Sequence, residues 1–177
     1  MKWSAKFFAI LFLFLGKFSF SASGQILQIA LGVDGLKCPM CSRGVEKSLL
    51  KLTFIEKVEM DLEKTEATIY VKKNVAVSLN DIVKKVCDAG FSTRFLKIQM
   101  NMAMVNQPTP SCLNYGGISY IISGSGKINL TGNVWLRIAD KQFMNPREFQ
   151  AFENMVTSSD TICSSENFRE AHHVIIL

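Results

Sequence analysis

Two cysteines, Cys38 and Cys41, stand three positions apart, and their type and spacing indicate a chemically active site. A pair at this spacing either binds a soft metal ion or interconverts between a dithiol and a disulfide, and both reactions depend on the thiolate. A helical pattern of apolar residues follows, at Val45, Leu49 and Leu52. We therefore expect Cys38 in a loop and Cys41 close to the first helical turn, where the helix dipole lowers a thiol pKa.

The elements around this pair are predicted from apolar periodicity and turn residues. They are strands over residues 25–33, 54–62, 67–71 and 91–100, a helix from Ser42, and a second helix capped by Ser78 and ended at Gly90. The order strand, helix, strand, strand, helix, strand is that of the ferredoxin-like βαββαβ sandwich, an α+β fold. We place this domain at residues 25–104.

The residues that carry this pattern resemble a known family. The segment from Leu31 to Cys41, the charged hairpin after it and the segment from Cys87 to Phe91 are similar to the heavy-metal-associated domain of copper chaperones, periplasmic mercury scavengers and P-type metal ATPases. The resemblance covers residues 26–98 and implies the same fold. It also implies that Cys38 and Cys41 bind Cu(I), or else Zn(II), Cd(II) or Hg(II), and that a thiol-bearing acceptor such as a metal transporter receives the ion.

The family usually opens this loop with Gly-Met-Thr-Cys, where this chain has Gly35-Leu36-Lys37-Cys38, and Pro39 is also less usual. Two soft thiolates suffice for Cu(I), whereas Zn(II) normally takes four ligands, and no histidine or carboxylate adjoins the pair. The ammonium of Lys37 would offset the single negative charge of a Cu(I) dithiolate. These arguments favour Cu(I).

Two side chains near the cysteine pair each have two alternative roles, and a third is expected in the core. Met40 is a soft auxiliary ligand or a packed or exposed loop residue, and Phe91 packs in the core or shields the site. Cys87 lies on the apolar stripe of the second helix and is expected to be a buried small hydrophobe.

Two other interpretations of the pair remain open. Cys38-Pro39-Met40-Cys41 also resembles the active motif of glutaredoxins and periplasmic thiol oxidases, in which Cys38 would attack and Cys41 would resolve. A thioredoxin-like fold needs a different strand order and a cis-proline that faces the disulfide. In this chain a hairpin, a helix and a strand are expected after the first helix, and no proline follows until Pro108. The third interpretation is an interaction module without metal use. Because no nucleophile with a spaced histidine and acid is present, we expect a carrier or sensor and not an enzyme.

Residues 1–24 have the pattern of a secretory signal peptide, with an apolar run over 7–15 and small residues before Gln25. Cleavage predicts a periplasmic or secreted protein without a stable membrane span, although an uncleaved anchor would look similar. It also removes Lys2, Lys6 and Lys17, which lowers the net charge from +5 to +2. We therefore expect no nucleic-acid partner.

The second half is predicted to be a small α+β or β-rich module over residues 112–177, joined by a linker over 105–111. Strands are expected at residues 118–122, 134–138 and, less clearly, 128–130, with a helix capped by Asn145 and a closing edge strand at 174–177.

The chain has five cysteines, and Cys112 and Cys163 flank this second half, where a disulfide between them would stabilise a small core. His172 and His173 are expected to be a solvated pair near the end of the chain, with metal ligation as the alternative.

Overall fold

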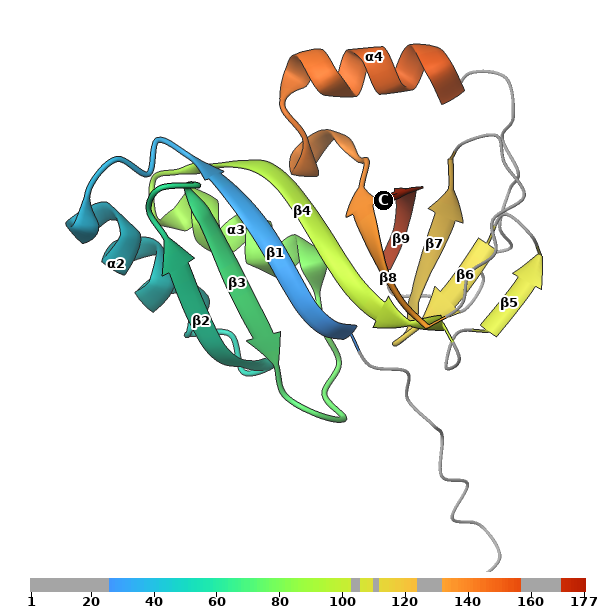
Figure 1. Cartoon of the computed structure of the whole chain (residues 1–177), viewed down its shortest axis with the longest axis horizontal. Coiled ribbons are helices and arrows are strands. Elements are labelled where there is room, and N and C mark those ends of the chain that lie inside the picture. The colour runs from blue at the N-terminus through green and yellow to red at the C-terminus, as the bar shows by residue number, and fades with distance from the viewer. Residues whose placement is uncertain (1–25, 103–105, 110–111, 124–131, 157–169) are drawn as a thin grey trace, which may run out of the picture.

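The computed structural model describes residues 26–102, 106–109, 112–123, 132–156 and 170–177 (Figure 1). Its first part has the predicted order: β1 (Ile26–Asp34), α2 (Pro39–Leu49), β2 (Ile55–Asp61), β3 (Glu66–Val71), α3 (Leu79–Asp88) and β4 (Ser92–Asn101). These strands are antiparallel in the order β2-β3-β1-β4. The ferredoxin-like fold is therefore confirmed.

Alternation in β1 explains how the sheet and helices pack. Ile29, Leu31 and Val33 are completely buried, and they join one hydrophobic cluster with residues of α2 and α3. Figure 1 shows α2 and α3 together on the far side of β1 to β4. From Ile29 to Val33, every second residue of β1 thus faces the helices, as the period of two in a strand requires.

Two details of the helices differ from the sequence prediction. The first helix, α2, begins at Pro39, three residues earlier than expected, and ends at Leu49, so Leu52 lies in the following turn although it still packs on the core. Proline fits the first helical position because its missing N–H has no partner there in any helix. The second helix begins as predicted, with the hydroxyl of Ser78 accepting the N–H of Asp81.

The second half is rich in strands. It contains β5 (Asn106–Thr109), β6 (Cys112–Tyr115), β7 (Ile118–Ile122), β8 (Asn133–Ile138), the short 3₁₀ helix η3 (Lys141–Phe143), α4 (Pro146–Val156) and β9 (Glu170–Ile176). The strands expected at 118–122 and 134–138 are confirmed, whereas residues 128–130 fall in a part of the chain that the structure does not describe. The helix after Asn145 is confirmed, and the side chain of Asn145 accepts the N–H of Glu148 at 2.9 Å.

The sheet continues across the predicted boundary between the halves. The nine strands of the described residues form one sheet in the order β2-β3-β1-β4-β8-β9-β7-β6-β5. In it, β8 pairs antiparallel with β4, where Lys97 lies opposite Arg137. The linker predicted over 105–111 is wrong for Asn106–Thr109, which form β5. The edge position predicted for 174–177 is also wrong, because β9 lies between β8 and β7 and runs parallel to β7.

The hydrophobic core follows the sheet through both halves. Leu136, Ile138 and Val174 of the second half belong to the same buried cluster as the ferredoxin-like part. A smaller cluster, built on Ala139, Met144 and Phe152, lies under α4, which Figure 1 shows beyond the ends of β8 and β7. Within the described ranges, no helix is long and apolar enough to cross a lipid bilayer.

Candidate metal centre

The loop between β1 and α2 is held by a turn and one buried side chain. Gly35 has φ +83°, a left-handed conformation that glycine adopts without strain, and its carbonyl accepts the N–H of Lys37 at 2.9 Å. Leu36 is 1% exposed and packs in the main core. Leu36 therefore packs the loop onto the core at the position where the family that the sequence resembles usually has methionine.

Cys38 and Cys41 lie together at the beginning of α2, as the sequence predicts. Their Cα atoms are 5.1 Å apart and their sulfur atoms are joined in a disulfide. Cys38 is the N-cap residue, and its Sγ accepts the N–H of Cys41 at 3.0 Å. Both side chains are half-buried. The two sulfurs are thus positioned by the helix itself.

The electrostatics of this helix end favour negative charge on sulfur. The positive end of the dipole of α2 lies at the N-cap, the N–H of Cys41 points at Cys38 Sγ, and the first turn contains no acidic residue. In the reduced protein, the thiolates, or a metal ion bound by two thiolates, would supply the negative charge that helices commonly obtain from Asp or Glu.

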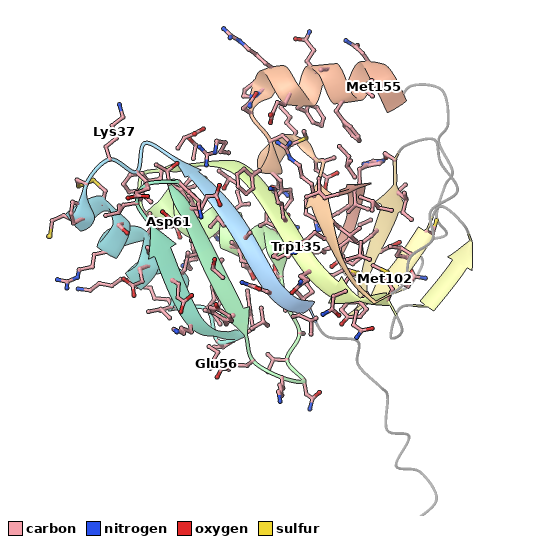
Figure 2. All side chains as sticks on the ribbon, viewed as in Figure 1. Lys37, Glu56, Asp61, Met102, Trp135 and Met155 are labelled. Atoms are coloured by element: carbon pink, nitrogen blue, oxygen red, sulfur yellow. A yellow bond between two sulfur atoms is a disulfide. The ribbon has the colours of Figure 1, made fainter. Side chains whose placement is uncertain are left out.

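The three predicted neighbours of the pair, Lys37, Met40 and Phe91, have different surroundings. Lys37 is exposed and projects outward from the loop in Figure 2. Met40 is 76% exposed. Phe91 is half-buried and packs on the core, and its ring lies beside Gly35, 3.7 Å from where a Cβ would stand. Phe91 therefore connects the loop after α3 with the metal loop.

The prediction for Cys87 is wrong. Its thiol is free and exposed, because the buried face of α3 consists of Leu79, Ile82, Val83 and Val86. Among the described residues, no group of three or more His, Cys, Asp or Glu side chains is arranged to hold a metal ion. Of the His, Cys, Asp and Glu side chains in the described part of the chain, a metal ion at the α2 terminus would therefore bind two, Cys38 and Cys41.

In the second half, one prediction stays untested and one is corrected. Cys112 is 2% exposed in β6, while Cys163 is not among the described residues, so their disulfide stays a prediction. The solvated histidine pair is wrong for His172, which is 3% exposed and lies between the carboxylates of Asp140 and Glu170. No local pattern marks Asp140 or Glu170, so sequence reasoning missed this cluster.

Comparison with known families bears directly on the first half. Residues 30–92 match the model of the heavy-metal-associated domain, and this match includes Cys38, Cys41 and Phe91. Residues 30–92 are a heavy-metal-associated domain. Copper-transporting ATPases of Helicobacter pylori and Helicobacter felis are each 32% identical to the chain over 62 residues, which is 35% of this chain. The chain spans only 8% of the length of these ATPases.

Solved structures also match the heavy-metal-associated domain. One is a copper-binding domain of a P-type ATPase, 31% identical, covering 38% of this chain and 89% of its own, with a TM-score of 0.35. Another is oxidised MerP from Ralstonia metallidurans, 25% identical, covering 39% of this chain and 94% of its own, with a TM-score of 0.36.

Proposed function

We propose that this protein is an extracytoplasmic carrier that captures Cu(I) with the thiolates of Cys38 and Cys41 and passes it to the thiols of an acceptor protein, such as a metal transporter. The observation that carries the proposal is the pair of sulfurs at the N-terminus of α2, with Cys38 Sγ accepting the N–H of Cys41. Membership of residues 30–92 in the heavy-metal-associated family supports the same conclusion.

Capture requires the dithiol. A dithiol reductant first reduces the Cys38–Cys41 disulfide by thiol–disulfide exchange, which leaves two thiols on this chain and a disulfide on the reductant. Binding of Cu(I) then releases both thiol protons, since thiolates are the ligands. The resulting complex has one net negative charge, which the N-terminus of α2 stabilises.

Transfer proceeds by ligand exchange. An acceptor thiolate attacks the copper, one bond from copper to Cys38 or Cys41 breaks, and the released sulfur takes up a proton. A second acceptor thiolate completes the exchange. Both cysteines are only half-buried, and Met40 beside them is largely exposed, so the sulfurs are accessible to such an attack.

Two ligands favour Cu(I) over Zn(II). Soft thiolates at low coordination number suit Cu(I), whereas Zn(II) takes four ligands in closed sites. Among the described residues, no His, Cys, Asp or Glu joins the pair as a third or fourth ligand. Cd(II) and Hg(II) are also soft ions that this pair can accept, and the titration below includes them.

The test is an anaerobic titration of the reduced protein with Cu(I), Zn(II), Cd(II) and Hg(II) against a competing chelator. We expect one Cu(I) per chain in the wild type and at least a hundredfold weaker binding in Cys38→Ser and in Cys41→Ser. Cys87→Ser is the matched control, because it removes an exposed thiol from the same domain, and it should bind as the wild type does. Equal binding by wild type and Cys38→Ser would overturn the proposal.

A thiol-disulfide oxidoreductase is the second candidate, and the disulfide between Cys38 and Cys41 favours it. The strand order β2-β3-β1-β4 argues against it, because thiol oxidoreductases of the thioredoxin class need a different sheet. Turnover of a disulfide substrate by the wild type, combined with weak Cu(I) binding, would decide for this candidate.

The extracytoplasmic location in this proposal rests on the signal pattern of residues 1–24. Cell fractionation combined with N-terminal sequencing tests it. The expected result is a periplasmic or secreted protein that begins at Gln25, and an intact N-terminus in the cytoplasm would contradict it.

A further inference from the structure

A chain of polar groups joins β9 to the beginning of α3, outside the metal centre. The carboxylate of Glu170 accepts hydrogen bonds from the hydroxyl of Ser78 at 2.7 Å and from the N–H of Leu79 at 3.2 Å. A second link lies beside it, where the side chain of Gln142 in η3 donates to the side chain of Asn80. The second half thus contacts the first half through side chains at the N-terminus of α3 as well as through the pairing of β8 with β4.

His172 connects this carboxylate with another. Its Nδ1 lies 2.6 Å from Asp140 Oδ2, and its Nε2 lies 3.0 Å from Glu170 Oε2. A neutral imidazole has one N–H and one lone pair, so it can donate to only one of two carboxylates, while the lone pair would repel the other. Because both ring nitrogens face carboxylates, His172 is an imidazolium with both nitrogens protonated.

The pKa values agree with this geometry. Burial disfavours the charged form of His172, but the hydrogen bonds to Asp140 and Glu170 outweigh burial and raise its pKa to about 9. Burial also opposes ionisation of Asp140, yet the hydrogen bonds from His172 and His173 lower the pKa of that carboxyl to about 2. The same balance lowers the pKa of Glu170.

Other groups packed around His172 come from neighbouring elements. The ring of Tyr120 in β7 lies 6.5 Å from it, and Phe143 in η3 packs edge-on at 5.2 Å. Burial raises the pKa of Tyr120 far above its ordinary value, and the charge of Glu170 and the neighbouring Tyr115 raise it further, so the phenol stays neutral. His173 is more exposed and lies 3.2 Å from the other oxygen of Asp140.

We propose that Asp140, His172 and Glu170 form a proton-dependent latch that holds the second half of the chain on the N-terminus of α3. With His172 charged, Glu170 remains fixed on Ser78 and Leu79. Loss of one proton places an imidazole lone pair against a carboxylate in a buried site, and the latch opens. The latch contacts the N-terminus of α3. Phe91, which follows the C-terminus of that helix, lies beside Gly35 in the loop between β1 and α2, so α3 connects the latch with the metal centre.

The test follows histidine protonation and helix opening together in the full chain. Nitrogen NMR of ¹⁵N-histidine-labelled protein should show His172 with both ring nitrogens protonated at pH 7.5, when an ordinary histidine is mostly neutral. Hydrogen exchange at Leu79, corrected for its intrinsic pH dependence, should rise up to tenfold per pH unit between about pH 6.5 and 9 and then level off, because one proton is linked to opening.

Variants separate the latch from general loss of stability. Glu170→Gln should lower the pKa of His172 by at least one unit and abolish the pH dependence of hydrogen exchange at Leu79. His173→Gln is the control, since the ring of His173 is the more exposed of the two and contacts Oδ1 of Asp140, whereas His172 contacts Oδ2. It should leave His172 doubly protonated at pH 7.5. Neutral His172 at pH 7.5 in the wild type, or exchange at Leu79 without pH dependence, would overturn the latch, and neither observation requires a variant to fold.

Discussion

Cys38 has a structural role and a proposed metal-binding role, and the substitution Cys38→Ser distinguishes between them. As the N-cap of α2, its side chain accepts the N–H of Cys41, and as a thiol it is a candidate metal ligand. Serine is also a good N-cap acceptor but a poor ligand for Cu(I). Cys38→Ser therefore removes metal binding while preserving the beginning of the helix, which is why this variant tests ligation more cleanly than alanine would.

Gly32 gives a residue-level prediction about packing. A Cβ at this position of β1 would lie 2.5 Å from the ring of Phe95, which is 9% exposed, so Gly32→Ala forces that ring to move. We expect a loss of about 1–3 kcal/mol in the free energy of unfolding. Urea denaturation monitored by circular dichroism measures it.

Gly44 is the matched control. It lies in α2, and a Cβ there would meet no atom within 4 Å. Gly44→Ala should therefore stabilise the protein by about 0.5–1 kcal/mol through helix propensity. Equal effects of the two substitutions would show that Phe95 does not restrict Gly32.

At the scale of elements, α3 depends on Ser78 in two ways. The hydroxyl accepts the N–H of Asp81 and donates to Glu170. Ser78→Ala should lower the free energy of unfolding by about 1–2 kcal/mol, because it removes an N-cap and one partner of a carboxylate. Ser78→Thr keeps a hydroxyl and should recover most of that loss. If alanine and threonine cost the same, the hydroxyl does not stabilise α3. Urea denaturation is again the measurement.

Most elements of the first half were predictable because their apolar residues alternate or recur at helical spacing. The errors concerned the residue at which helix α2 begins and the face of helix α3 that is exposed. The beginning of α2 was missed because cysteine is not a usual N-cap, although Pro39 at the first helical position was an available signal. Cys87 was misplaced because an apolar stripe does not reveal which of its members reach solvent near the end of a helix.

The candidate site was predictable for a related reason. Cys38 and Cys41 are close in the sequence, so the local turn that brings them together is encoded within a few residues. The orientation of Lys37 was not encoded in this way. Its side chain projects outward, and the helix end adds electrostatic support for a thiolate.

At the scale of the whole molecule, long-range strand pairing escaped the sequence analysis. The pairing of β4 with β8 and the parallel pairing of β9 with β7 join segments far apart in the chain, and no local pattern specifies a strand's neighbour. The burial of His172 follows from this arrangement, because β9 is central in its half of the sheet. A histidine near the end of a chain otherwise suggests exposure.

The latch predicts how stability depends on pH. The folded pKa of His172 is raised to about 9, so its contribution is complete below about pH 6.5 and is lost as the pH rises through 9. The folded pKa of Asp140 is lowered to about 2, so its contribution is present above about pH 4 and is lost toward pH 2.

The free energy of unfolding should therefore be greatest between about pH 4 and 6.5 and should fall by roughly 3 kcal/mol toward pH 9. Urea titrations across this range measure it, and His172→Gln should flatten the alkaline decline. An increase in stability from pH 6.5 to 9 would contradict the assignment of His172 as an imidazolium.

The central claim concerns the ligands of the captured ion, and X-ray absorption spectroscopy of the Cu(I)-loaded protein tests it most directly. With one Cu(I) per chain, we predict a first coordination shell of two sulfur atoms and no nitrogen or oxygen, unchanged in Cys87→Ser and lost in Cys38→Ser. A first shell that contains nitrogen or oxygen ligands, or that persists in Cys38→Ser, would contradict a carrier built on Cys38 and Cys41.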